Sequence, residues 1–246
     1  MATGPVFERD HHRRIAQALS SLDAELLQSL ACWFGGGTAI ALRQGEYRES
    51  VDIDFLVSDV AGYRDLRQRL RGAVDLRALT CAGQHPIPLE NEPRIDQYGI
   101  RTFLLMGDAR IKFEIVHEGR ILLSPPGRND RICGVAALSA IDVGASKLLA
   151  NADRRADDST FSRDAIDLAM LDLPPRDLRA ALGKAAGAYG PTVADDMHAA
   201  LDSLRDRPGR LHRCMDALSI TLPPAFIQQK LRHLSRRMKL ASAGAA

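Results

Sequence analysis

The sequence predicts an α+β protein in which a mixed β-sheet flanked by helices comes first and a helical domain follows. Three segments between residues 51 and 117 alternate apolar and polar residues, which is typical of half-buried strands. After residue 136 apolar residues recur at helical spacing instead, in segments separated by proline or glycine. We therefore expect two domains, residues 1–130 and 131–246, with the boundary inside 125–136.

The elements of the first half are expected in the following order. The apolar spacing predicts helices over residues 11–30, 38–44 and 63–74. The alternating segments predict strands over 51–58, 101–106 and 110–117, with a possible extension of the sheet at 121–123. Gly107-Asp108 is a tight-turn sequence, so the last two long strands should form a hairpin. The proline-containing stretch 80–99 is expected to be a long loop.

The second half is expected to contain helices only. The predicted segments are 138–150, 161–172, 176–188, 192–204, 210–219 and 224–240. No apolar stretch reaches the roughly 18 residues that a membrane-spanning helix needs, and the first ten residues do not have the composition of a secretion signal. The four cysteines lie far apart, which argues against a disulfide scaffold or a zinc module. We expect a cytoplasmic protein without a membrane partner.

Positive charge is concentrated near the C-terminus. Between Arg205 and Lys239 there are nine Lys or Arg residues and two acidic ones, although the whole chain has a net charge of only +2. Such a segment suits a polyanionic partner, and a solvated helix face is the alternative. If the partner is RNA, the candidate contacts are Arg232, Arg236, Arg237 and Lys239.

The residues with the clearest chemical signal follow three consecutive glycines. Gly35, Gly36 and Gly37 precede the predicted helix that starts at Thr38, so backbone N–H groups and the helix N-terminus can face an anion. Glycines before a helix often make only a turn, and this feature alone is weak.

Asp52 and Asp54 lie two residues apart on a predicted strand, and side chains at that spacing share one face. Two neighbouring carboxylates suit Mg²⁺, which usually takes one or two carboxylates together with substrate phosphates. A solvent-facing edge strand is the alternative. If the later strand with Lys112 and Glu114 lies alongside, three carboxylates converge and could hold two metal ions for an in-line phosphoryl displacement.

These motifs resemble the polymerase-β-type nucleotidyltransferase superfamily. The matching pattern is G-G-T at residues 36–38, R-x-S-x-D-x-D at 48–54 and K-x-(D/E) at 112–114. Within the superfamily the chain resembles the AbiEii/AbiGii toxin family of bacterial abortive-infection and toxin–antitoxin systems. Two later stretches carry this narrower resemblance: D-x4-K-x2-A at 142–150 and R-x8-D-x2-D-L at 155–168.

The resemblance implies roles for individual residues. Those implied in metal binding are Asp52, Asp54 and Glu114, and Lys147 joins them in catalysis. Those implied in nucleotide binding are Gly36, Gly37, Thr38, Ser50, Lys147, Asp164 and Asp167, with Arg48 in support. Either aspartate of the last pair could orient Lys147, and both could equally pair with Arg155 or Arg163 on the helix surface. His11 and His12 have no partner at a useful spacing.

The function implied is transfer of a nucleoside monophosphate from a nucleoside triphosphate (NTP) to a hydroxyl group, with two Mg²⁺ ions and release of pyrophosphate. The favoured acceptor is RNA, in particular a tRNA 3′ end, and the enzyme would be a toxin restrained by a separate antitoxin protein. Two alternatives remain open. One is a small-molecule acceptor, as in aminoglycoside nucleotidyltransferases. The other is a non-catalytic RNA- or protein-binding module, because Glu114 stands where many relatives carry aspartate.

Overall fold

A computed structural model describes residues 7–243 of the chain, which fold into two compact units. The sheet unit consists of the chain up to Glu46 together with Ser50–Ser139. The helical unit consists of the short segment Tyr47–Glu49 and the chain from Ala140 onward. The α+β class predicted from the sequence is confirmed.

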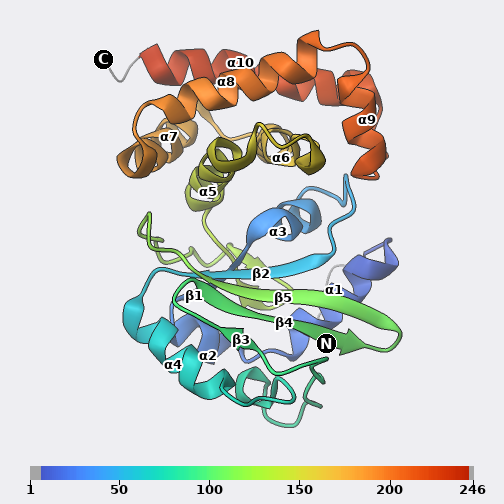
Figure 1. The fold of residues 1–246 in the computed structure, drawn as a ribbon, viewed down its shortest axis with the longest axis vertical. Helices are drawn as coiled ribbons and strands as arrows, with labels where there is room; N and C mark the ends of the chain where they lie inside the picture. Colours follow the sequence, from blue (N-terminus) through green and yellow to red (C-terminus); the bar gives the residue numbers. More distant parts are fainter. Residues whose placement is uncertain (1–6, 244–246) are drawn as a thin grey trace. The chain divides into compact units, whose positions relative to one another are not determined.

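The sheet unit is built on a five-stranded mixed sheet with the order β1-β2-β5-β4-β3 (Figure 1). β2 and β5 run parallel, and the other neighbouring pairs are antiparallel. The strands are β1 (Cys32–Gly35), β2 (Asp52–Val57), β3 (Arg94–Ile95), β4 (Gly99–Met106) and β5 (Ala109–His117). The three predicted strands and the Gly107-Asp108 turn are therefore confirmed. β1 was not predicted, because all four of its residues are buried and no alternation marks it.

From residue 7 onward, four α-helices belong to the sheet unit: α1 (Asp10–Ser21), α2 (Ala24–Ser29), α3 (Gly36–Arg43) and α4 (Val60–Leu70). The prediction of one continuous helix over 11–30 was wrong. The chain leaves helical geometry at Leu22, and the Asp23 side chain accepts a hydrogen bond from the Leu26 N–H, which starts α2 as a new capped helix.

The segments between the long strands also differ from the prediction. The expected loop 80–99 contains the short edge strand β3, and a 3₁₀ turn, Arg77–Leu79, precedes it. The expected extension at 121–123 is not a strand; the Leu123 N–H bonds to the Ser58 hydroxyl instead. A separate hairpin of β6 (Arg131–Ile132) and β7 (Val135–Ala136) follows.

Alternation along β2 and β5 separates an apolar face of the sheet from a polar one. Ile53, Phe55 and Phe113 are fully buried, and the rings of Phe34, Phe55 and Phe113 form a row with centroids 5.6 and 5.8 Å apart. A slip of one residue in β2 would turn Asp52 and Asp54 into this core, so burial of the aromatic residues fixes the register.

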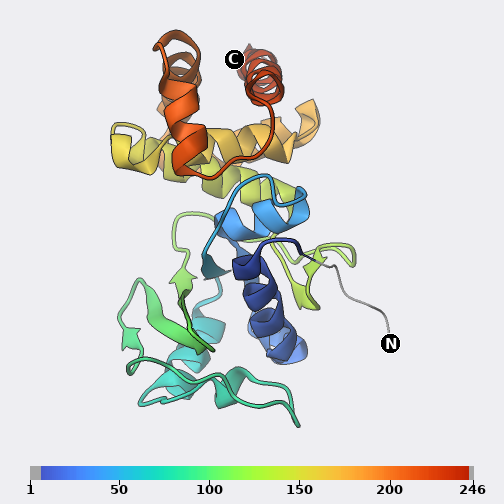
Figure 2. The ribbon, with the colours of Figure 1, turned by 90° about the vertical axis from the view of Figure 1, so that its right-hand side faces the viewer.

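Within the described residues the helical unit contains six α-helices, as predicted. Figure 2 shows this unit from a second side. They are α5 (Ala140–Arg154), α6 (Arg163–Leu171), α7 (Pro175–Tyr189), α8 (Thr192–Asp206), α9 (Arg210–Ala217) and α10 (Pro224–Ala243), with a 3₁₀ turn at Asp158–Thr160. α10 packs against α6, α7, α8 and α9. No helix within residues 7–243 has both the length and the apolar character needed to span a membrane.

The division between the units differs from the predicted boundary at residue 130. It falls between Ser139 and Ala140. The hairpin of β6 and β7 belongs with the sheet, because the Leu138 N–H donates to the carbonyl oxygen of Phe34 in β1. Sequence composition also gave no sign that Tyr47–Glu49 would belong to the helical unit.

Candidate active site

The glycine turn connects β1 to α3 and lies against the β2 carboxylates. Gly36 has φ +67°, and a Cβ placed on it would lie 2.3 Å from Oδ2 of Asp54. A side chain at Gly36 would therefore displace Asp54, and the left-handed backbone would also be strained. Glycine is required here because backbone and carboxylate approach each other closely.

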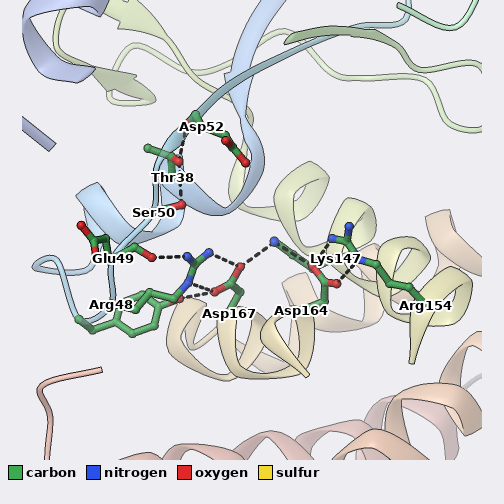
Figure 3. A network of polar contacts seen from close by, with 10 residues as sticks. Thr38, Arg48, Glu49, Ser50, Asp52, Lys147, Arg154, Asp164 and Asp167 are labelled. Carbon is green, nitrogen blue, oxygen red and sulfur yellow. Dashed lines mark hydrogen bonds and ion pairs between the residues drawn. The ribbon is translucent and has the colours of Figure 1, made fainter. Parts of the chain in front are cut away.

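Thr38, the residue after the glycines, is fully buried. Its hydroxyl lies 2.8 Å from the Ser50 hydroxyl and 2.5 Å from the carbonyl oxygen of Asp52 (Figure 3). Thr38 has a single hydroxyl proton, which it donates to this carbonyl, so the Ser50 hydroxyl donates to Thr38. Both predicted nucleotide-binding hydroxyls thus join the start of α3 to the start of β2.

His12 supports the same segment, a role that the sequence did not indicate. Its ring is fully buried, Nδ1 lies 2.8 Å from a Glu46 carboxylate oxygen, and Nε2 accepts the Ser50 N–H at 3.1 Å. The accepting Nε2 places the ring proton on Nδ1, which donates to Glu46. The partners are 34 and 38 residues away in the sequence, so local spacing could not reveal them.

β2 and β5 are neighbours in the sheet, which is the condition for the three carboxylates to share one face. In the parallel pairing Asp54 stands opposite Glu114, and Asp52 stands opposite Lys112. Directly paired residues point to the same face of a sheet. Asp52, Asp54 and Glu114 are all partly exposed on the polar face, whereas the residues between them are buried.

Glu114 is nonetheless paired with cations rather than with the two aspartates. Its carboxylate oxygens lie 2.6 Å from Arg101 Nε and 2.6 Å from Lys112 Nζ. Burial acts to raise the pKa of Glu114, but hydrogen bonds and charge from Lys112 and Arg101 outweigh it and hold the pKa below the ordinary 4.5. Arg101 was not predicted; it is opposite Glu114 on β4. Within the described part of the chain, no group of three acidic, His or Cys side chains is arranged to hold a metal.

A second charged cluster lies in the helical unit and includes the predicted Lys147. The Lys147 ammonium on α5 lies 2.9 Å from Asp164 and 2.6 Å from Asp167, both on α6 (Figure 3). All three residues are buried. Of the roles left open for the two aspartates, the geometry favours orienting the lysine.

Arg48 and Arg154 extend this cluster at its two ends. Arg48 makes a bidentate pair with Asp167, at 2.7 and 2.9 Å, and the Tyr47 hydroxyl donates to the same carboxylate. Burial acts to raise the pKa of Asp167, but the charges of Arg48 and Lys147 outweigh burial and hold the pKa far below its ordinary value.

At the other end Arg154 Nε donates to Asp164 at 2.7 Å. The predicted alternative pairing with Arg155 was wrong. Arg155, the first residue after α5, bonds instead to Asp196 on α8 at 2.6 Å.

Residues 17–238 match a family model described as nucleotidyl transferase AbiEii toxin, type IV TA system. The chain belongs to the AbiEii nucleotidyltransferase toxin family. The resemblance drawn from the motifs is confirmed, and this family member is a nucleotidyltransferase.

Two solved structures are similar to this AbiEii family chain over nearly its whole length. JHP933 from Helicobacter pylori is 15% identical, with 97% of this chain and 94% of that chain covered and a TM-score of 0.49. The nucleotidyltransferase toxin MenT4 from Mycobacterium tuberculosis is 17% identical, with 96% and 94% covered and a TM-score of 0.46. A comparison with curated proteins gives no match.

The basic residues predicted to contact RNA lie on α10 of the helical unit. Arg232, Arg236 and Lys239 are exposed. Arg237 is only partly exposed, and its guanidinium bonds to the Asp172 carboxylate and, at 2.9 Å, to the carbonyl oxygen of Leu173. Arg237 therefore has a structural role within the helical unit, and the other three are available to a ligand.

Proposed function

We propose that this AbiEii family enzyme transfers a nucleoside monophosphate from an NTP to a hydroxyl of RNA, with a tRNA 3′ end as the favoured acceptor. The acceptor oxygen forms a bond to the α-phosphorus, and the bond from that phosphorus to the bridging oxygen of the β-phosphate breaks. Pyrophosphate leaves, and the acceptor hydroxyl loses its proton. The modified RNA would no longer support translation. As the toxin family implies, a cognate antitoxin protein would restrain the enzyme.

The observation that carries this proposal is the position of Asp52 and Asp54 beside the glycine turn. Two carboxylates on one face of β2 offer the oxygen ligands that Mg²⁺ prefers. The glycine turn lies directly beside Asp54, so its backbone N–H groups would meet phosphate oxygens next to the metal ligands. Bound Mg²⁺ would lower the pKa of the attacking hydroxyl and neutralise charge on the leaving pyrophosphate.

Glu114 is proposed as the third metal-binding carboxylate, beside Asp52 and Asp54. Its salt bridges with Arg101 and Lys112 would have to change for a metal to bind. A carboxylate offers about four lone-pair sites, and Arg101 and Lys112 each engage one oxygen. A divalent ion next to Glu114 would be repelled by both cations. We therefore propose that Lys112, the more exposed of the two side chains at 41%, turns away when metal binds.

Lys147 is proposed to contact the triphosphate as a positioned point charge. An ammonium group has three N–H donors, and two of them are used by Asp164 and Asp167. The third would donate to a phosphate oxygen. The two aspartates would hold the ammonium in place, so that little side-chain freedom is lost when the nucleotide binds.

Incorporation of labelled NTP into total RNA tests the transfer reaction. Wild-type protein is expected to label RNA in the presence of Mg²⁺, and Asp52→Asn is expected not to. Asp108→Asn is the matched control, because Asp108 is an exposed acid in the β4–β5 turn of the same sheet unit. Equal labelling by wild type and Asp52→Asn, or none by either, would refute the proposal.

The acceptor class is tested on α10. Arg232, Arg236 and Lys239 are changed together to glutamine, and Arg237 is kept because it bonds to Asp172. RNA labelling should fall strongly and lose much of its sensitivity to salt. Undiminished RNA labelling would show that these α10 residues do not bind the RNA. Transfer to a small molecule with no RNA labelling would favour the aminoglycoside-type alternative.

A further inference from the structure

A cavity of about 410 Å³ in the helical unit is lined by polar and basic side chains that have no part in the site described above. It lies where the segment after α5 meets α8 and the start of α9. The side chains that matter to its chemistry are Arg155, Asp158, Ser162, Ser203, Arg207 and Arg210. The volume lies within the range of small-ligand sites.

Arg210 is the most unusual residue of this cavity. It is 6% exposed, and its terminal nitrogens bond to Asp158 at 2.7 Å and to Ser162 at 3.1 Å. Its Nε is buried and has no hydrogen-bond partner within residues 7–243. Buried donors without an acceptor are rare because each loses its hydration and gains nothing in return. An acceptor brought into the cavity by a ligand beside Arg210 would satisfy this Nε.

The charges around the cavity indicate that the ligand is an anion. Three arginines and one aspartate line it, so the lining has a surplus of two positive charges. Arg210 forms an ion pair with Asp158, and Arg155 forms one with Asp196. Arg207 has no ion pair within residues 7–243, so its charge is the one available to an anion. Guanidinium groups are well suited to bind phosphate because their N–H groups match two of its oxygens.

The start of α6 adds to the positive potential. Ser162, the N-cap residue of α6, makes no capping hydrogen bond with its side chain, and its hydroxyl accepts from Arg210 instead. The N-terminal end of a helix carries partial positive charge. An anion in the cavity would thus meet this helix end as well as the guanidinium of Arg210.

We propose that this cavity binds a backbone phosphate of the acceptor RNA. The inference rests on the proposed function, in which RNA is the acceptor. Arg207 and Arg210 lie in the basic stretch 205–239 that the sequence marks for a polyanionic partner, yet they are separate from the α10 residues assigned above. Arg210 contacts the phosphate from inside the cavity, and the exposed Arg207 contacts it from the rim.

Binding of a fluorescent single-stranded RNA to the full chain, followed by anisotropy without NTP, tests this site. Arg207→Glu is expected to weaken binding about tenfold or more and to reduce the dependence of log K on log salt concentration by roughly 0.7–1. Arg210→Lys keeps the charge but loses Nε and the paired donors, and it should weaken binding by several-fold. Arg179→Glu, the same charge reversal at an exposed position of α7, is the control and should bind like wild type except for a small general charge effect.

Thermal melting of each variant shows whether it folds, and Arg207→Glu decides the question if Arg210→Lys is unstable. RNA binding by Arg207→Glu equal to that of Arg179→Glu would overturn the proposal. A second result would also overturn it: inorganic phosphate or ATP raises the melting temperature only when Arg210 is present, and RNA binding does not depend on Arg207. The cavity would then be a site for a free phosphate. Because no NTP is present, failure of the transfer reaction would refute the proposed function without affecting this result.

Discussion

In the sheet unit three carboxylates face two cations, whereas in the helical unit two carboxylates face three cations. The first set, Asp52, Asp54 and Glu114 with Arg101 and Lys112, is partly exposed and carries one surplus negative charge. The second set, Asp164 and Asp167 with Arg48, Lys147 and Arg154, is mostly buried and carries one surplus positive charge.

The difference means that the charged side chains of the sheet unit can accept a ligand cation, whereas the charges in the helical unit are mostly compensated by one another. Charges that are partly exposed can exchange partners at low cost, since water screens them. Buried charges need partners that stay in place, because removing one leaves another uncompensated. Variants of the first set should therefore change activity with little loss of stability. Variants of the second set should lower stability, in addition to any loss of the proposed contact between Lys147 and the triphosphate.

The largest effect is expected from Asp52→Asn. It should lower the rate of nucleotidyl transfer by about a thousandfold or more, as loss of a residue central to catalysis does. Its melting temperature should stay close to wild type, because Asp52 is partly exposed. Steady-state transfer rates and thermal melts measure both, and a strong loss of stability would break the contrast between the two sets.

Asp167→Asn should show the reverse pattern. Arg48 and Lys147 would keep buried charges without a full counter-charge, and we expect a loss of about 3–5 kcal/mol in the free energy of unfolding. Asp196→Asn, which loosens only the exposed pair with Arg155, should cost less than about 1 kcal/mol. Urea unfolding of both variants gives the comparison, and equal losses would contradict it.

Acid should destabilise the protein through the buried set. The folded-state pKa of Asp167 lies below the ordinary 3.8, so its ionised form stabilises the folded state. This contribution is complete above the ordinary pKa and is lost as the pH falls below 3.8 toward the lower folded-state pKa. Melting temperatures between pH 6 and pH 2.5 should therefore fall less steeply for Asp167→Asn than for wild type, and parallel curves would refute the assignment.

Gly36→Ala should reduce both stability and activity. The left-handed backbone costs about 1–2 kcal/mol for a residue with a Cβ, and the Cβ would press on the Asp54 carboxylate. Gly72→Ala, which has the same backbone conformation but open space around it, is the matched control. Gly72→Ala should lose only the backbone part of this stability and should retain activity. An equal loss of activity in both variants would show that the contact between Gly36 and Asp54 is not what matters for activity.

The smallest effect is expected from Lys112→Met. Removing the ammonium frees one Glu114 oxygen and should lower the Mg²⁺ concentration needed for half-maximal transfer by a few-fold. Arg110→Met, two residues earlier on β5, changes the charge equally but leaves Glu114 paired. A higher Mg²⁺ requirement in Lys112→Met would instead make Lys112 a phosphate contact.

Periodicity of two and of 3.6 residues was enough to predict the long strands, the six C-terminal helices and the shared face of Asp52 and Asp54. These features depend on local spacing, and burying the apolar face leaves one choice of register. The family motifs likewise follow from residue types at short separations.

Long-range pairings could not be obtained in this way. The helix break at Leu22, the buried strand β1 and the assignment of Tyr47–Glu49 to the helical unit leave no periodic signal. Only folding places Arg101 and Lys112 next to Glu114. The same holds for the contact of His12 with Ser50 and for the salt bridge of Arg48 with Asp167. Sequence determined which charged groups exist and which face of an element they share, and tertiary structure decided their partners, because charges pair across space with whichever opposite charge packing brings near.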